Sequence, residues 1–431
     1  MKEQGHEVQF LVPVVREMRT GIGIFDTGMG IPGRIKRKGI AVRLMPPRLL
    51  LILRSMLLPF KSGYSETAWA FGMFFQGLER DAWHILQEID RFRPDVLVAD
   101  FAFPAASIAA DFAKIPYALL YHSGLPFRGD GIPPFGSGLP IGYGKTTGPM
   151  TKYLRRENRL LPRLDRRVNT ARRAFGLPPM QPDILRRPYS PWLNLIPSAE
   201  IMEAPRNNLS SCTYFIGPCL GNRAEPLELP AQALVPGKFK VFVSLGTVFN
   251  NKPAVFRKIL RALDHPEYQV IVSAGGAYGK LSKEIISSNA IVLPSVSQVS
   301  LLPFIDLFIS HGGNNSINEA LASGKQILVL PVGGEQADNA SRVVHLCVGK
   351  RIDISDFSEL QLRGAVDEMR RTDSFRVRAE TMMHGLREFD GCHTASRCIE
   401  WVAQHRRPLE AEGLSCNLSI EGLQRISGLQ L

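Results

Sequence analysis

The sequence has little cysteine, no long apolar run and no apolar N-terminus. Its six cysteines, in 431 residues, form no C-x-x-C pair and show no zinc-site spacing with histidine, so we expect thiols in a reducing compartment. A membrane-spanning helix needs roughly 20 apolar residues. The most apolar stretch, Leu49–Phe60, is shorter and contains Arg54. The first residues are polar, unlike those of a signal peptide, and we expect a cytoplasmic location.

The composition is that of a folded, basic protein. Hydrophobic residues make up 45% and charged residues 21%, which argues against disorder, collagen or a coiled coil. A net charge of +12 is compatible with nucleic acid, a membrane surface or an anionic small ligand as partner. Because no nucleic-acid motif or aromatic interleaving accompanies the charge, we expect no nucleic-acid partner.

The densest basic segment is the expected helix 150–175. Its arginines are Arg155, Arg156, Arg159, Arg163, Arg166, Arg167, Arg172 and Arg173. Two interpretations stay open: a solvated helix face, or a patch for an anionic membrane surface or an acidic acceptor.

Short apolar runs alternate with helical periods along both halves of the chain. We expect strands at 8–13, 95–100, 116–121, 240–244, 268–273, 291–293, 306–310 and 326–330. We expect helices at 66–92, 105–114, 150–175, 253–263, 316–323, from about 337, and at 356–371, 373–388 and 393–405. This βαβ rhythm predicts an α/β protein with parallel, doubly wound sheets.

A stretch rich in proline and glycine divides the two halves. The predicted organisation is an N-terminal Rossmann-like domain 1–216, a linker 217–237, a second Rossmann-like domain 238–390, and a C-terminal helix and tail 391–431. Residues 124–148 are also rich in glycine and proline and are expected to form a long loop. Two α/β domains of similar size predict a ligand cleft between them.

One segment combines a strand, a glycine turn and a helix start. An apolar run ends at Ser310, His311-Gly312-Gly313 follow, and a helix is expected to begin near Asn315 and Ser316. Free N–H groups and the positive end of a helix dipole form an anion site there. Glu319 has two open interpretations, as the end of a capping box with Ser316 or as an acceptor for ligand hydroxyls.

Two further loops are expected on the same rim, because ligands of open α/β sheets bind at the carboxyl ends of the strands. One is Ser244-Leu245-Gly246-Thr247. The other is Pro331–Gln336, in which Glu335 and Gln336 suit sugar hydroxyls. Together the three loops predict a phosphate site beside polyol-binding groups, and hence a nucleotide-sugar ligand.

These motifs resemble the donor-binding signature of glycosyltransferase family 1, the UDP-glycosyltransferase-like enzymes, and most closely the bacterial macrolide-glycosyltransferase type. The matching residues are His311, Gly312, Gly313, Asn315, Ser316, Glu319, the run Pro331–Ala340, Ser244–Thr247 and Gly217-Pro218. Ser295–Gln298 falls where many plant members carry Trp-x-Pro-Gln around the base, and Gln298 is retained. Asn314 stands where Trp is common.

The resemblance implies a fold of two Rossmann-like domains facing a cleft, known as GT-B. It implies that His311, Ser316 and Thr247 contact the diphosphate, Glu319 the ribose, and Glu335 and Gln336 the sugar. The implied donor site is completed by Ser244, Val296, Gln298, Gly312, Gly313 and Asn315. The implied activity is transfer of a hexose from a UDP or dTDP sugar to a hydroxyl of a small apolar acceptor. Neither a cofactor nor a metal is implied, and the chain has no Asp-x-Asp pair.

The implied mechanism uses a histidine after the first N-terminal strand as base and an Asp as its orienter. Asp100 matches the orienting Asp by position, with a helix cap or loop residue as the alternative. Lys2–Val8 resembles the end of the first helix and the start of the second strand, so the strand, loop and histidine are expected to precede Met1. His6 is therefore not the expected base. The remaining histidines apart from His311 are interpreted as structural: His84, His122, His265, His345, His384, His393 and His405.

Three explanations of this missing unit stay open: an internal start, a decayed remnant, or another residue acting as base. Two alternative functions also remain. One is a nucleotide-sugar-binding remnant without activity, and the other is a membrane-surface enzyme that glycosylates a lipid.

Overall fold

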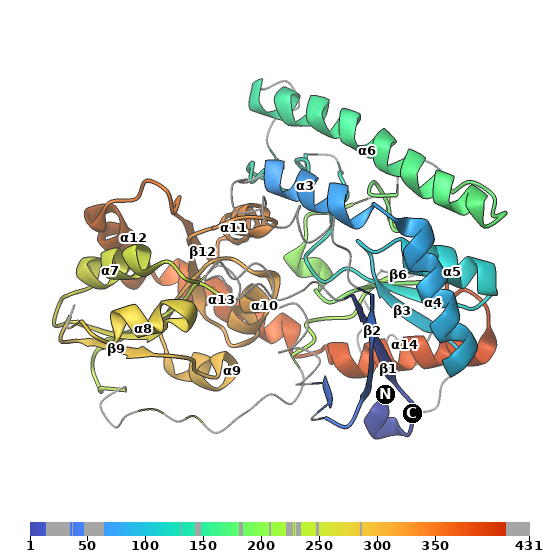
Figure 1. Cartoon of the computed structure of the whole chain (residues 1–431). Helices are drawn as coiled ribbons and strands as arrows, with labels where there is room; N and C mark the ends of the chain where they lie inside the picture. Colours follow the sequence, from blue (N-terminus) through green and yellow to red (C-terminus); the bar gives the residue numbers. More distant parts are fainter. Residues whose placement is uncertain are drawn as a thin grey trace.

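The structure is a computed structural model with two α/β lobes side by side (Figure 1). It describes residues 1–13, 35–36, 38–46, 64–129, 131–142, 148–180, 184–206, 208–220, 227, 229, 234–246, 250–284 and 287–410. The apolar stretch Leu49–Phe60, Thr247, much of the expected linker and the tail from residue 411 lie outside these ranges.

The first lobe is built on a four-stranded parallel sheet of order β3-β4-β5-β6. Its strands are β3 (Leu97–Asp100), β4 (Tyr117–Leu120), β5 (Leu193–Ile196) and β6 (Thr213–Phe215). The helices of this lobe are α3 (Tyr64–Phe74), α4 (Leu78–Phe92), α5 (Ala105–Ala113) and α6 (Gly148–Ala174). A separate parallel pair, β1 (Gln9–Pro13) and β2 (Ala41–Met45), precedes them. Lys2–Gln4 form one helical turn that Gly5 ends in a left-handed conformation, as the expected helix end requires.

The second lobe is a six-stranded parallel sheet of order β12-β11-β10-β7-β8-β9. Its strands are β7 (Phe239–Ser244), β8 (Tyr268–Ser273), β9 (Ala290–Leu293), β10 (Leu307–Ser310), β11 (Gln326–Val329) and β12 (Gly349–Arg351). Its helices are α7 (Pro253–Ala262), α8 (Tyr278–Leu281), α9 (Gln298–Leu301), α10 (Asn314–Ala322), α11 (Gln336–His345), α12 (Glu359–Arg371) and α13 (Asp373–Leu386). With β7 counted as strand 1 and the sheet read from β9, the order is 3-2-1-4-5-6, that of a doubly wound sheet. The predicted α/β class is therefore confirmed.

Several expected elements differ from those observed. The helix expected over 66–92 is two helices, α3 and α4, because Gly77 adopts a left-handed conformation with φ of 63° between them. Strands β2, β5, β6 and β12, of three to five residues each, were not predicted from the sequence.

The last helix returns to the first lobe. α14 (Gly391–His405) packs its buried face on β5 and β6, where Trp401 and Cys398 join a core cluster with Tyr214 and Leu193. The Tyr214 hydroxyl donates a 3.0 Å hydrogen bond to the carbonyl of Leu409. Residues 391–409, predicted as a separate segment with the tail, therefore pack on the core of the N-terminal lobe.

The basic segment forms α6, a long helix on the outside of the first lobe (Figure 1). Most of its arginines are exposed, but Arg172 is buried and pairs with Asp111 at 2.5 Å. Among the described helices, none combines the length and apolar character needed to cross a membrane.

Replacing the α14 anchor tests its share of stability. Trp401 is 6% exposed, so Trp401→Ala leaves a cavity between helix and sheet and lowers the free energy of unfolding by about 3–5 kcal/mol. Urea unfolding followed by circular dichroism measures the change. Leu360→Ala, at a side chain 80% exposed, is the control and stays within about 0.5 kcal/mol of the wild type. An equal loss in both variants contradicts the assignment of α14 to the core.

Candidate functional site

The predicted anion site lies at the switch point of the second sheet. β7 and β10 are neighbours, with Ser244 paired to Ser310, and their crossovers leave the sheet in opposite directions. The loops after both strands therefore open onto the same crevice, where ligands of this architecture bind. The structure brings together the strand ends that the sequence analysis placed on one rim.

The His311 ring fills the space between two glycine loops. A Cβ atom added at Gly246 or at Gly313 would lie 2.6 Å from its Nε2 atom, so both positions require glycine. Burial lowers the pKa of His311 to about 4, although the Ser244 backbone interacts with the ring in the opposite sense. The imidazole is therefore uncharged at neutral pH, and its buried Nδ1 atom has no hydrogen-bond partner among the described residues.

Helix α10 begins two residues earlier than expected. Its first residue is Asn314 and its N-cap is Gly313, without a side-chain cap. The N-terminal N–H groups thus face the crevice beside His311, with Asn315 exposed and Ser316 partly exposed. A capping box starting at Ser316 does not fit this helix start, which overturns that interpretation of Glu319.

Glu319 instead contacts a second predicted donor residue. Gln298 is the first residue of α9, and its Nε2 atom donates a 2.6 Å hydrogen bond to Glu319 Oε2. Glu319 is 9% exposed. Val296, two residues before Gln298, is partly buried. The two residues expected near ribose and base therefore lie in one place.

The third loop is held by its own glutamine. Gln336 Oε1 accepts the N–H groups of Val332 and Gly333 at 2.9 and 3.1 Å, so its amide nitrogen is the part left for a ligand. Glu335 stands directly before α11, and burial raises the pKa of its carboxyl. Of the polar groups of Glu335 and Gln336 that were predicted to bind a sugar, the Gln336 oxygen is thus already bonded within the loop.

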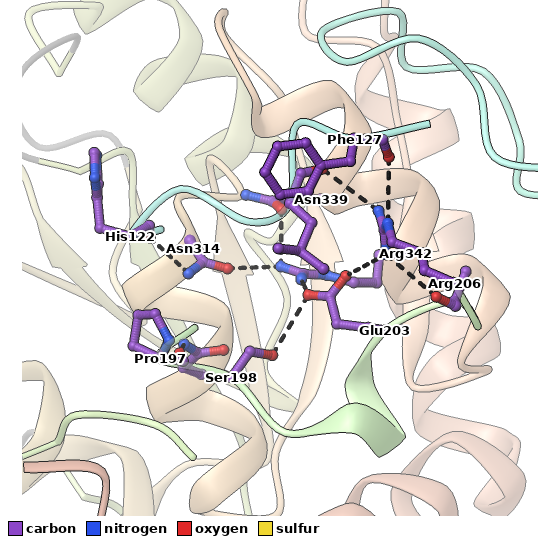
Figure 2. A network of polar contacts seen from close by, with 12 residues as sticks. His122, Phe127, Pro197, Ser198, Glu203, Arg206, Asn314, Asn339 and Arg342 are labelled. Carbon is purple, nitrogen blue, oxygen red and sulfur yellow. Dashed lines mark hydrogen bonds and ion pairs between the residues drawn. The ribbon is translucent and has the colours of Figure 1, made fainter. Parts of the chain in front are cut away.

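A buried polar network joins the two lobes beside the site (Figure 2). The Arg342 guanidinium on α11 pairs with Glu203 of the first lobe and donates hydrogen bonds to the Asn314 and Asn339 side chains at 2.6 and 2.8 Å. Arg206 also contacts Glu203, at 3.4 Å. Sequence reasoning missed this network, because its members come from four separate segments.

Asn314 extends this hydrogen-bond network to the first lobe. Its Oδ1 accepts from Arg342, and its Nδ2 donates a 2.8 Å hydrogen bond to the backbone carbonyl of His122 (Figure 2). Asn339 in turn donates to the carbonyl of Gly312 at 2.9 Å. The loop that forms the anion site is thereby fixed to the first lobe.

Asp100 is not a helix cap, because the next helix, α5, begins at Ala105 with Pro104 as its N-cap. Its Oδ1 atom accepts the N–H of Ala102 at 2.8 Å, and its Oδ2 atom lies 2.5 Å from Nδ1 of His122. β3 and β4 are adjacent parallel strands, and both residues follow at their carboxyl ends. The sequence indicated only a structural role for His122, because the contact with Asp100 forms only when β3 and β4 pair.

One cavity connects these residues. It has a volume of about 1510 Å³ and includes Asp100, His122 and the loop Gly333–Gln336 in its lining. Much of the rest is apolar, with contributions from Phe71, Phe74, Leu97, Phe101, Phe135 and Ile85. His6 also lines this cavity, and its Nε2 atom lies 3.8 Å from Glu400 Oε1.

Two Rossmann-like lobes, each built on a parallel sheet, define the GT-B fold class. Residues 79–408 match the family model of UDP-glucoronosyl and UDP-glucosyl transferases, and the chain belongs to that family.

Relatives and solved structures agree with this family. NDP-glycosyltransferase YjiC of Bacillus subtilis (strain 168) is 30% identical over 208 residues, 48% of this chain and 53% of the relative, so the match spans about half of that relative's length. The glycotransferase of kitacinnamycin superposes with a TM-score of 0.67 at 20% identity, over 94% of this chain and 92% of the other. The glycosyltransferase VinC, in complex with dTDP, gives a TM-score of 0.56 at 15% identity, over 92% and 100%.

Crowding the His311 ring tests the anion site. In Gly246→Ala the added methyl group meets the imidazole, and the φ of 80° is strained for alanine, so UDP binds about tenfold more weakly, or ~1.4 kcal/mol. Isothermal titration calorimetry with UDP measures the affinity. Gly279→Ala is the control, because nothing lies within 4 Å of its added Cβ. Unchanged affinity in Gly246→Ala places the diphosphate elsewhere.

Proposed function

We propose that this protein transfers a hexose from a nucleoside-diphosphate sugar to a hydroxyl group of a small apolar acceptor. One observation carries the proposal. The anion site at the β7/β10 switch point and the Asp100–His122 contact lie on facing lobes, linked by the Asn314 hydrogen bond. Family membership supports the reaction class.

The donor fits the second lobe in three parts. The N-terminus of α10 and the uncharged His311 would meet the diphosphate, since free N–H groups and the helix dipole favour an anion. Glu319, beside Gln298, would accept ribose hydroxyls. Glu335 and the Gln336 amide would meet the sugar at the edge of the cavity. UDP and dTDP both remain candidates, and dTDP is bound by VinC.

The chemistry requires neither a cofactor nor a metal in this proposal. The acceptor oxygen attacks the anomeric carbon while the bond from that carbon to the diphosphate breaks. The negative charge that develops on the leaving diphosphate lies at the positive end of α10, which stabilises it there. The apolar cavity supports an acceptor with a large apolar body and a single reacting hydroxyl.

A transfer assay with a donor-site variant tests the function. UDP-glucose and dTDP-glucose are offered with a panel of apolar phenols and alcohols in excess EDTA, and mass spectrometry detects the glycoside. Wild-type protein gives product, and Glu319→Gln, which keeps shape but loses charge, lowers kcat/KM about tenfold through weaker donor binding. Glu388→Gln, at an exposed position, is the matched control.

The outcomes separate the alternatives. Binding of UDP or dTDP without any transfer supports a nucleotide-sugar-binding remnant. Loss of product in EDTA that Mg²⁺ restores contradicts the metal-independent mechanism.

We also propose peripheral membrane contact through α6 and a cytoplasmic location. Arg155, Arg159 and Arg163 recur every fourth residue and are all exposed, which suits an anionic surface. The free thiols of Cys212, Cys347 and Cys398 support a reducing compartment.

Vesicle sedimentation tests the membrane contact. Wild-type protein binds vesicles containing phosphatidylserine more strongly than neutral phosphatidylcholine vesicles, and the triple change R155Q/R159Q/R163Q removes the difference. High salt also removes it, because the attraction is electrostatic. Equally weak binding to both kinds of vesicle contradicts the proposal.

A further inference from the structure

The loop 131–142 of the first lobe reaches the helix that follows the residues proposed to meet the sugar. A 2.8 Å hydrogen bond from the N–H of Gly142 to the carbonyl of Gly131 joins its two ends, so the loop is a compact unit. Its tip, residues 134–138, lies against the first turn of α11 in the other lobe. The position of this part of the first lobe therefore depends on the second lobe.

Asp338 of α11 holds the tip with both of its carboxylate oxygens. Oδ1 accepts the N–H of Gly138 at 2.7 Å, and Oδ2 accepts the N–H of Gly136. Both glycines are buried, and a buried N–H group without an acceptor costs free energy. The conformation of the tip therefore depends on the Asp338 carboxylate.

Gly138 is also held through its carbonyl. This oxygen accepts hydrogen bonds from Ser341 Oγ at 2.9 Å and from Arg351 Nη1 at 2.6 Å. A Cβ atom added at Gly138 would lie 2.7 Å from the Cβ of Ala337, so the loop and the helix are in close contact. The tip is thus fixed to α11 and to the strand that follows it, β12.

The residue next to this contact is a wall of the large cavity. Phe135 directly precedes Gly136 and lines the cavity of about 1510 Å³, and its ring centre lies 6.1 Å from that of Phe71 on the same lining. Glu335 lines this cavity as well, and its carbonyl accepts the N–H of Asp338 at 3.1 Å. One helical turn therefore carries both a residue proposed to meet the sugar and the residue that holds the Phe135 segment.

We propose that Asp338 is a positioning residue for the acceptor, because it holds the loop that carries Phe135 as a wall of the acceptor cavity. This inference rests on the proposed function. The acceptor class that fits best has a planar apolar body, since Phe135 and Phe71 both offer aromatic rings to the cavity. When the loop leaves α11, the acceptor loses the Phe135 contact, while the donor site keeps its own residues.

The charge of Asp338 makes this contact sensitive to pH. Burial, together with the charge of Glu335, raises the pKa of Asp338 to about 6, although the two loop N–H groups and Arg351 act in the opposite sense. Arg206 of the first lobe also interacts with its charge. Two further charged side chains, those of Glu203 and Arg342, line the small cavity beside Asp338. A protonated carboxyl leaves one of the two N–H groups without its acceptor, so the KM for the acceptor rises as the pH falls through about 6.

Steady-state kinetics test the proposal, with UDP-glucose or dTDP-glucose as donor and the planar phenol that the wild type glycosylates best as acceptor. D338A raises the KM for the phenol about tenfold, whereas the Kd for UDP, measured by calorimetry, stays within about twofold of wild type. D338N keeps one acceptor oxygen, so its KM rises less and no longer depends on pH near 6. N318A is the matched control and keeps the wild-type KM. It removes a 2.9 Å hydrogen bond between the lobes, from Asn318 to the carbonyl of Pro197, without touching the loop.

A double-mutant cycle separates the positioning of Phe135 from a general loss of structure. F135A also raises the KM for the phenol, and D338A/F135A raises it no further, because Asp338 acts through that ring. Additive increases, an unchanged KM in D338A, or an equal rise in N318A overturn the inference while the transferase function stands. If the Asp338 variants do not fold, a wild-type KM that stays constant through about pH 6 overturns it. Wild-type protein without any transfer refutes the proposed function and this inference together.

Discussion

A buried ion pair between Arg342 of α11 and Glu203 of the first lobe joins the two lobes. Each of these side chains is only 5–6% exposed, and a buried charge without its partner costs several kcal/mol. The guanidinium also holds Asn314 and Asn339, which fix the start of α10 and the carbonyl of Gly312. The start of α10 and the loop before it are therefore tied to the interface between the lobes.

A second constraint acts within the C-terminal sheet. The His311 ring occupies the space between the loops after β7 and β10, so neither Gly246 nor Gly313 can carry a side chain. Burial keeps this imidazole uncharged three residues before the start of α10 at Asn314. Because His311 carries no charge, the attraction for an anion at this helix N-terminus would come from the helix dipole and the backbone N–H groups.

Local sequence signals were sufficient to place the glycine-containing loops but not the contacts of the facing wall. Strand, glycine turn and helix start are contiguous around Ser310–Ser316, so their local structure could be predicted, although α10 begins earlier than its cap residues suggested. His122 lacks such a signal, because its partner Asp100 is on another strand and comes within reach only when β3 and β4 pair. Arg342, Glu203 and Arg206 escaped prediction for the same reason.

By itself the sequence determined the α/β class, the two halves and the three glycine-containing loops, since these follow from periodicity and turn chemistry within short windows. Only the tertiary structure decided which residues face each other. In the folded chain α14 packs on the first lobe. Glu319, a predicted cap candidate, accepts a hydrogen bond from Gln298, and His122 contacts Asp100. Such contacts depend on strand order and lobe docking, and neither is encoded in any local window of residues.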